Sequence, residues 1–533
     1  MTKTLFTASF SILASFSLLS NAVAAPLQEI QSTFLYVKPG GAGDCSNWSS
    51  ACDLQIAFSL ANAGDQVWVA AGTYKPTMDY DRTKSFELKS GVSVYGGFPD
   101  AGGDWASRDP WTHVTTLSGD IGSQGQTSDN SFHVAKAEYV DNTATLDGFY
   151  IKHGSADDVD PPNIWGGGMY TRESDLHISN ISFQDNTAVS GGGLFVDGGN
   201  PILDNVEFID NSVVEDGGGM YNFAGASPSL SEVTFSGNHA VNGDGGGMFN
   251  AAGNGPFLTN VQFLNNSAIN GGGMFNRSGS EPEIYFSTFI ANIVTLSGGG
   301  MVNDHSNPFI NSVLFDSNQT GDQGGGGAIT NLDSQPIIEY SLFINNSAWA
   351  GGALFNSNSN ASFTNVTFSH NTAQIAGTMA NIASNPTIIN ATMYENSSTS
   401  GFGGIANDDG SCPVITNSIL WGNVGTQIYG FDSDSIPVVT YSDIEGGWVG
   451  DGNINEVPVL QPLADNGGFT QTHALGAGSS AIDVGSLAVC PAADQRGFPR
   501  PIDGDGDGMP ICDMGAYEFG SVSLNLYLPL ILK

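Results

Sequence analysis

Three carboxylates at alternate positions are the clearest candidate for metal chemistry in this chain. Asp503, Asp505 and Asp507 occur in the sequence DGDGDG. At this spacing alternate side chains can converge on one hard cation, and the glycines permit a tight turn, so the pattern predicts a structural calcium site. Position twelve of the loop is Met514 instead of the bidentate glutamate of an EF-hand. A neighbouring acid would have to complete the site, and the alternative is a solvated acidic turn without metal.

A column of aromatic residues is the candidate binding surface. The rings follow a column of apolar residues at a regular spacing: Tyr170, Phe195, Tyr221, Phe249, Phe275 and Phe355. Adjacent residues of a strand face opposite ways, so rings next to inward-facing residues would point outward and stack into a stripe that binds sugar rings. The alternative is a stripe that loops cover, or one that only supports a corner. We favour this alternative, because stacked rings stabilise a repeat protein without any ligand.

Acidic side chains could also act on polysaccharides. The chain has two adjacent acid pairs, Asp157/Asp158 and Asp408/Asp409. A glycosidase needs two carboxylates that flank the scissile bond, but adjacent pairs are common in a chain with 53 acids. A lyase acting on uronates needs a basic group, and Arg172 and Arg277 are the only Lys or Arg residues from Gly154 to the end of the repeats. The sequence therefore assigns no catalytic residue.

All these candidates are carried by a repeat. Ten times between residues 183 and 423, a large apolar residue precedes an asparagine by three positions, at intervals of 25 to 28 residues. Proline, alternating apolar and polar residues, a glycine cluster and a Met-rich column recur at fixed offsets, which indicates short strands separated by corners. We predict an all-β fold, a right-handed parallel β-helix of coils of about 26 residues. Its asparagines should stack and hydrogen-bond along the axis, and its methionines should fill the interior.

The two ends of the chain depart from the repeat. Leu54 to Ala63 has the spacing of a short amphipathic helix that begins after Asp53 and caps one end. The last 85 residues should cover the final coil, because an exposed strand edge is prone to association. The expected organisation is a signal peptide (1–24), an N-terminal cap with irregular first coils (25–160), ten coils (161–448), a C-terminal cap (449–520) and an apolar tail that could serve as a sorting or anchoring element (521–533).

Charge and cysteine content restrict the partners. The net charge of −39 would repel a phosphate backbone, so nucleic acid is excluded as a partner. After the signal peptide no apolar run is long enough to span a bilayer, and we expect a monomer. The cysteines fit an oxidising compartment, with disulfides Cys45–Cys52 and Cys490–Cys512 and with Cys412 as a buried free thiol. The predicted localisation is secreted or at the cell surface.

Six segments, in three groups, carry a resemblance to exported bacterial proteins. FINNSAWAGGALFN from Phe343 resembles the FxxN and GGA[ILV] repeats of chlamydial-type polymorphic outer-membrane proteins. DQVWVAAGTYKPT from Asp65 and SGVSVYGGF from Ser90 are similar to the first coils of secreted bacterial β-helix proteins. DNGGFTQTHALGAGSSAIDVG from Asp465, DQRGFPRP from Asp494 and CDMGAYE from Cys512 resemble the choice-of-anchor Q domain of bacterial surface proteins. The resemblance implies a surface-associated protein, some of whose relatives act in adhesion.

Three functions remain open from the sequence. The first is a non-catalytic adhesin that binds extracellular polysaccharide or another cell-surface component. The second is a carbohydrate-active enzyme, a polysaccharide lyase or glycoside hydrolase, with acids in a lateral groove. The third is a passive structural or display rod. A groove with clustered carboxylates would favour the enzyme, exposed aromatic rings the binding protein, and a featureless surface the rod.

Overall fold

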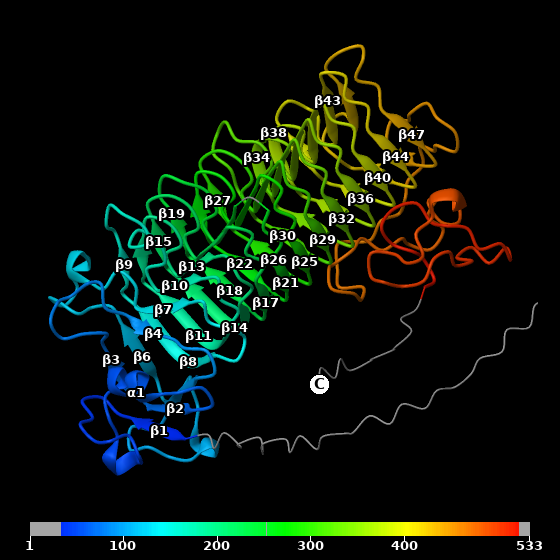
Figure 1. Ribbon diagram of the computed structural model, residues 1–533. Coiled ribbons are helices and arrows are strands. Elements are labelled where there is room, and N and C mark those ends of the chain that lie inside the picture. Colours follow the sequence, from blue (N-terminus) through cyan, green and yellow to red (C-terminus); the bar gives the residue numbers. More distant parts are fainter. Residues whose placement is uncertain (1–32, 252, 522–533) are drawn as a thin grey trace, which may run out of the picture.

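The computed structural model describes residues 33–251 and 253–521 and shows one elongated parallel β-helix (Figure 1). It has about 15 turns of about 26 residues, and the predicted right-handed parallel β-helix is confirmed. The signal peptide and residues 522–533 of the apolar tail lie outside the described residues. No helix in the described part of the chain is long and apolar enough to cross a membrane.

The solenoid is built from stacked sheets whose strands pair in parallel. The first sheet begins with β1 (Phe34–Val37), β2 (Gln66–Ala70), β3 (Gly72–Tyr74), β5 (Ser93–Phe98), β6 (Thr115–Ser118), β8 (Thr145–Lys152), β11 (His177–Gln184) and β14 (Ile202–Ile209). From there each coil contributes two shorter strands: β17 (Ser229–Ser231) and β18 (Thr234–Ser236), β21 (Phe257–Thr259) and β22 (Gln262–Leu264), β25 (Glu283–Tyr285) and β26 (Thr288–Ile290), β29 (Phe309–Asn311) and β30 (Leu314–Asp316), β32 (Ile337–Glu339) and β33 (Leu342–Ile344), β36 (Ser362–Thr364) and β37 (Thr367–Ser369), β40 (Thr387–Ile389) and β41 (Thr392–Tyr394), β44 (Val414–Thr416) and β45 (Ile419–Trp421), β47 (Val438–Thr440) and β48 (Asp443–Ile444). A residue with left-handed backbone, such as Asn260 at φ 55°, separates the two strands of a coil.

The second sheet carries the Met-rich column and the aromatic column. Its strands are β4 (Phe86–Glu87), β7 (Ala135–Glu138), β10 (Met169–Arg172), β13 (Leu194–Asp197), β16 (Met220–Phe223), β20 (Met248–Asn250), β24 (Met274–Arg277), β28 (Met301–Asp304), β31 (Ile329–Leu332), β35 (Leu354–Ser357), β39 (Met379–Ile382), β43 (Ile405–Asp408) and β46 (Ile428–Gly430).

The third side of the coil is narrow and interrupted. Its strands are β9 (Ser155–Ala156), β12 (Thr187–Ala188), β15 (Ser212–Val213), β19 (His239–Ala240), β23 (Ser267–Ala268) and β27 (Ile293–Val294), then β34 (Ser347–Ala350), β38 (Thr372–Ile375) and β42 (Ser397–Ser398). Short 3₁₀ turns lie in the two ends of the chain at Trp48–Ser50, Trp105–Ser107, Thr127–Asp129 and Leu487–Val489.

Like residues stack on like throughout the core. Phe235 pairs in register with Phe263, and their rings stack with centroids 4.8 Å apart. Met220, Met248 and Met274 are fully buried and in register with one another. Each coil therefore buries its apolar face against its neighbours, as the sequence period predicts.

Asparagine amides join successive coils in a buried ladder. Asn292 Oδ1 accepts the backbone N–H and an Nδ2–H of Asn266, each at 3.0 Å. Asn292 Nδ2 donates to Phe263 O and to Asn318 Oδ1, each at 2.9 Å. The same links join Asn186, Asn211, Asn238, Asn266, Asn292, Asn318, Asn346, Asn371, Asn396 and Asn423.

A second asparagine ladder runs along the second sheet and was not predicted. Its members follow the aromatic column by one residue and are linked from Nδ2 to Oδ1 at 2.8 to 3.0 Å: Asn222, Asn250, Asn276, Asn303, Asn331, Asn356, Asn381 and Asn407. The first ladder, at a corner, and the second, within the second sheet, together fix the register of each coil on the next.

The N-terminal helix is shorter than predicted. Helix α1 spans Leu54–Leu60, and Asp53 caps it by accepting the N–H of Gln55. Leu54 and Phe58 pack into the core of the first coils. The Cys45 and Cys52 sulfurs, 2.02 Å apart, form a disulfide next to this helix, and Cys490 and Cys512 form the second disulfide. Cys412 is free but partly exposed, so the expectation that its thiol is buried was wrong.

The C-terminal segment covers the end of the solenoid and then runs back along its side (red in Figure 1). Ile454 pairs with the last coil, and Trp448 packs against the core there. Beyond this point, Thr470 Oγ1 donates to Tyr340 O at 3.1 Å, and Asn390 Nδ2 donates to Asp513 O at 2.8 Å. The predicted end cap is therefore also a lateral cover. In the first sheet, the residue just before the stacked apolar residue of each coil points away from the core. Beneath this cover these outward-facing residues are buried: Leu342, Thr367, Thr392 and Ile419.

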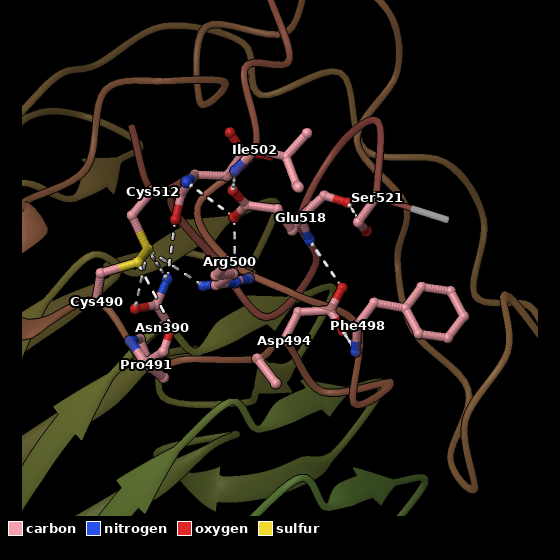
Figure 2. A network of polar contacts seen from close by, with 12 residues as sticks. Asn390, Cys490, Pro491, Asp494, Phe498, Arg500, Ile502, Cys512, Glu518 and Ser521 are labelled. Atoms are coloured by element: carbon pink, nitrogen blue, oxygen red, sulfur yellow. Dashed lines mark hydrogen bonds and ion pairs between the residues drawn. A yellow bond between two sulfur atoms is a disulfide. The ribbon is translucent and has the colours of Figure 1, made fainter. Parts of the chain in front are cut away.

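A buried ion-pair network holds this cover together (Figure 2). Arg500 and Glu518 have fully buried side chains, and Arg500 Nε lies 3.1 Å from Glu518 Oε2. Arg496 Nη2 lies 2.6 Å from Asp494 Oδ2. Burial and the Glu518 carboxylate raise the pKa of Asp513.

Replacing one asparagine of the first ladder tests its role in stability. Asn292→Ala strands two donors of Asn266 and the carbonyl of Phe263, each at about 1–3 kcal/mol when no partner replaces the lost one. The amide oxygen of Asn318 keeps the backbone N–H of residue 292 as its donor. We expect the free energy of unfolding to fall by about 3 kcal/mol or more, measured by urea unfolding followed by circular dichroism. The control is Asn265→Gly, an exposed neighbour at φ 55° that glycine adopts freely. Equal urea midpoints of unfolding for the two variants would contradict a stabilising role of the ladder.

Candidate functional site

The predicted aromatic stripe forms, but most of it is covered. Tyr170, Phe195, Phe249 and Phe275 are at most 4% exposed, so these four rings fit the covered stripe, the alternative that we favoured, and not the open one. Trp165 stacks on Phe195 with centroids 4.8 Å apart. The remaining two members of the stripe, Tyr221 and Phe355, are partly exposed.

Residues from neighbouring columns account for this burial. The Arg277 guanidinium lies 5.7 Å from the ring centroid of Phe249 and 5.2 Å from that of Phe275. Trp165 directly precedes the glycine cluster of its coil, and its ring covers Phe195 of the second sheet. The stripe therefore acts mainly as packing, as the favoured alternative expected.

An apolar pocket of about 220 Å³ opens where the ring column is interrupted. Phe355 is in register with Ala380, and Ala380 is in register with Ala406. At these two positions of the aromatic column the side chain is therefore a methyl group instead of a ring. The space above them is walled by Trp349 of β34 and Ile375 of β38. Phe431, 47% exposed, and Asp408 complete the rim.

The pocket joins two predicted candidates that are 53 positions apart in sequence, Phe355 and Asp408. Asp409 turns away with φ 52°, and its N–H donates to Asp408 Oδ1 at 3.0 Å. In the other acid pair, Asp157 forms an ion pair with Arg82, and Asp158 accepts the N–H of Val159 at 2.8 Å. Neither pair presents two carboxylates across a common space.

A polar cluster that sequence reasoning missed lies on the same side of the solenoid. Asp216 and Asp244 occupy equivalent positions in adjacent coils, and Asp216 Oδ1 accepts the N–H of Asp244 at 2.9 Å. Asp244 Oδ1 accepts from Asn270 Nδ2 at 2.8 Å. Arg277 bridges Asp244 and Asp304, with nitrogen to oxygen distances of 3.7 Å to each. The sequence signal was the acid immediately before the glycine cluster in two successive repeats.

Burial changes the acidity of this cluster. Desolvation raises the pKa of Asp216 to about 6, although the hydrogen bond from Asp244 N–H opposes the shift. Desolvation also raises the pKa of Asp244, opposed by the hydrogen bond from Asn270 and the charge of Arg277. A half-buried acid with a pKa near 6 can donate a proton to a leaving group at neutral pH.

The predicted metal ligands separate into two groups. Asp503 and Asp505 each place a carboxylate oxygen within 4.8 Å of the other and of Asp483. Asp507 does not join them, and its Oδ1 accepts the N–H of Met509 at 2.8 Å. Asp483 was not predicted, because it lies 20 positions before the motif and only the fold brings it there. Three carboxylate donors suit a hard cation such as calcium.

The pKa of Asp216 generates a prediction about stability. The folded protein keeps this proton up to about pH 6, whereas an unfolded chain releases it near 3.8. The native state therefore binds more protons in this window, and its stability falls as pH rises. We expect Asp216→Asn to become increasingly stable relative to the natural sequence between pH 4 and 7 in thermal unfolding. Asp210→Asn, at an exposed site, is the control, and a pH-independent difference for Asp216→Asn would contradict the assignment.

The comparisons with known proteins concern the fold. A family model described as right handed beta helix region matches residues 148–289. The crystal structure of pectate lyase Pel9A aligns at 14% identity over 92% of this chain and 96% of that chain, with a TM-score of 0.29. A rhamnogalacturonan lyase aligns at 13% identity over 81% and 92%, with a TM-score of 0.23. No curated protein matches. This chain is a right-handed β-helix protein.

Proposed function

We propose that this protein is a secreted or surface-associated adhesin that binds extracellular polysaccharide without cleaving it. The observation that carries the proposal is the apolar pocket of Trp349, Phe355, Ile375 and Phe431 with Asp408 at its rim. The C–H faces of a sugar ring pack on aromatic side chains, and a carboxylate accepts hydrogen bonds from hydroxyl groups.

The size of the pocket limits what enters it. Its volume of about 220 Å³ is below that of pockets that enclose a drug-sized molecule, so it would take one sugar ring or a side branch of a longer polymer. Binding of this kind gains affinity from repetition along the polymer and not from one contact.

The cellular setting of the proposal comes from the sequence. Residues 1–24 have the pattern of a signal peptide, and the two disulfides suit an oxidising compartment. The choice-of-anchor Q-like segment, 449–520, is held against the solenoid by buried polar contacts. We propose that it protects the last coils of a monomer and places the tail at the cell surface.

The test is depletion of the mature protein onto plant, algal and bacterial polysaccharides. We expect Trp349→Ala to weaken binding to the preferred polymer roughly 10- to 100-fold, because it removes the contact area of one large aromatic side chain. Phe257→Ala is the matched control, since Phe257 is 42% exposed on the first sheet, outside the pocket lining. Equal loss in both variants, or no loss in either, would contradict the pocket assignment, and no depletion by any polymer would favour the passive rod.

A second candidate function is supported by the Asp216 cluster. Asp216 and Asp244 lie at equivalent positions of adjacent coils, and the raised pKa of Asp216 suits a general acid. In this alternative Asp216 donates the proton to the leaving group and Asp244 acts as the nucleophile. Shortened oligosaccharides in the supernatant, analysed by mass spectrometry and abolished by Asp216→Asn, would establish the enzyme. Unsaturated products would indicate a lyase instead.

We also propose a structural calcium ion at Asp483, Asp503 and Asp505. Calcium should raise the melting temperature of the natural protein by several degrees relative to a chelated sample, because an ion that binds only the folded state stabilises it. Asp505→Asn should abolish this increase. Asp507→Asn should retain it, because Asp507 lies outside the cluster. Loss of the increase in the Asp507 variant alone would overturn the ligand set.

A further inference from the structure

A separate hollow lies beside helix α1. This helix belongs to the N-terminal coils, which are blue in Figure 1. Its volume is about 370 Å³, within the range of small-molecule sites. It is lined by Gln55, Phe58, Ser59, Pro76, Thr77, Lys84, Ser85, Glu87 and Lys89. One wall is the helix and the opposite wall contains β4 and the residues that flank it.

Two lysines and one acid, Glu87, line this hollow, and two bases against one acid is an unusual balance in this molecule. The chain carries a net charge of −39, and most Lys and Arg residues of the described part have a carboxylate within 4.0 Å. Lys89 has none among the described residues. Its ammonium donates to the Phe58 and Ala61 carbonyls at the end of α1, at 2.5 and 3.4 Å. An ammonium has three hydrogens, so one remains for an anion.

The second lysine is available for the same anion. Lys84 Nζ lies 3.7 Å from Asp81 Oδ2, and its side chain is 57% exposed. An exposed ion pair of this kind contributes little stabilising free energy. Lys84 can therefore leave Asp81 and bind a ligand at a small cost in free energy.

The rest of the lining suits a sugar. Gln55 Nε2 donates to Pro76 O at 2.9 Å and to Ser85 O at 3.1 Å, which ties the helix to the segments on either side. The Ser59 and Thr77 hydroxyl groups donate to Ile56 O and Asp79, so, like Glu87, they can accept hydrogen bonds from a sugar. Gln55, Pro76 and Thr77 also line a neighbouring hollow of about 570 Å³ with Tyr74 and Met78, where a second ring could continue.

We propose that the Lys84–Lys89 hollow binds an acidic sugar residue, through its carboxylate or sulfate group. This site is independent of the Trp349 pocket. The protein would therefore hold anionic glycans at its N-terminal coils while the pocket near its other end takes an uncharged ring.

The test is calorimetric titration of the full-length mature protein at low salt with galacturonic acid, galactose 6-sulfate, neutral galactose and inorganic sulfate. We expect one or both acidic sugars to bind, galactose not to bind, and Lys84→Gln with Lys89→Met to weaken binding at least tenfold. Affinity should also fall as salt rises, because the contact is ionic. A response to galacturonic acid alone or to galactose 6-sulfate alone identifies the anion.

Controls separate this site from folding and from the proposed function. Lys84→Gln alone changes an exposed side chain, so it should weaken binding without altering thermal unfolding. Trp349→Ala should leave acidic-sugar binding unchanged, whatever it does to polymer depletion. Binding that the double variant retains, equal binding of galactose, or inorganic sulfate binding as tightly as the acidic sugars would overturn the proposal.

Discussion

The hydrogen bonds between stacked asparagine amides are the interaction on which the rest of this structure depends. A coil of about 26 residues has too little apolar surface to fold alone, so its position is set by the coil beneath it. Each buried amide inside the first ladder is bonded to both neighbouring coils, as Asn292 is. A shift of one residue would strand several buried donors and acceptors at once, and this cost keeps every column in register.

The pocket and the surface beneath the C-terminal segment both arise where the residue type changes at a repeated position of the coils. Regular stacking of rings on the second sheet gives packing, and the replacement of rings by Ala380 and Ala406 gives a pocket. On the first sheet, the change to buried Leu342 and Ile419 in the outward column provides the surface on which the C-terminal segment lies. In both cases the ladders hold the coil geometry constant, so a small side chain leaves a space that its neighbours do not collapse to fill.

The sequence predicted the parts of the structure that repeat and missed those that depend on distant residues. The Phe, Asn and Met columns were sufficient for the coil, because like residues stack on like. Strand alternation left both an open and a covered ring stripe possible, because it cannot reveal that Arg277 lies over Phe249. Asp483 joins Asp503 only through the fold of the C-terminal segment. The Trp349 pocket had a signal, the interruption of the ring column, that becomes interpretable once the register is known.

Hydrogen exchange read by mass spectrometry, with and without the polysaccharide that depletes the protein, tests the binding account most directly. Binding in the pocket should add protection in residues 349–355, 375–382 and 405–408, which line it but are separated in sequence. Protection confined to the strands that carry Asp216 and Asp244, together with new reducing ends in the polymer, would contradict it and identify a catalytic protein.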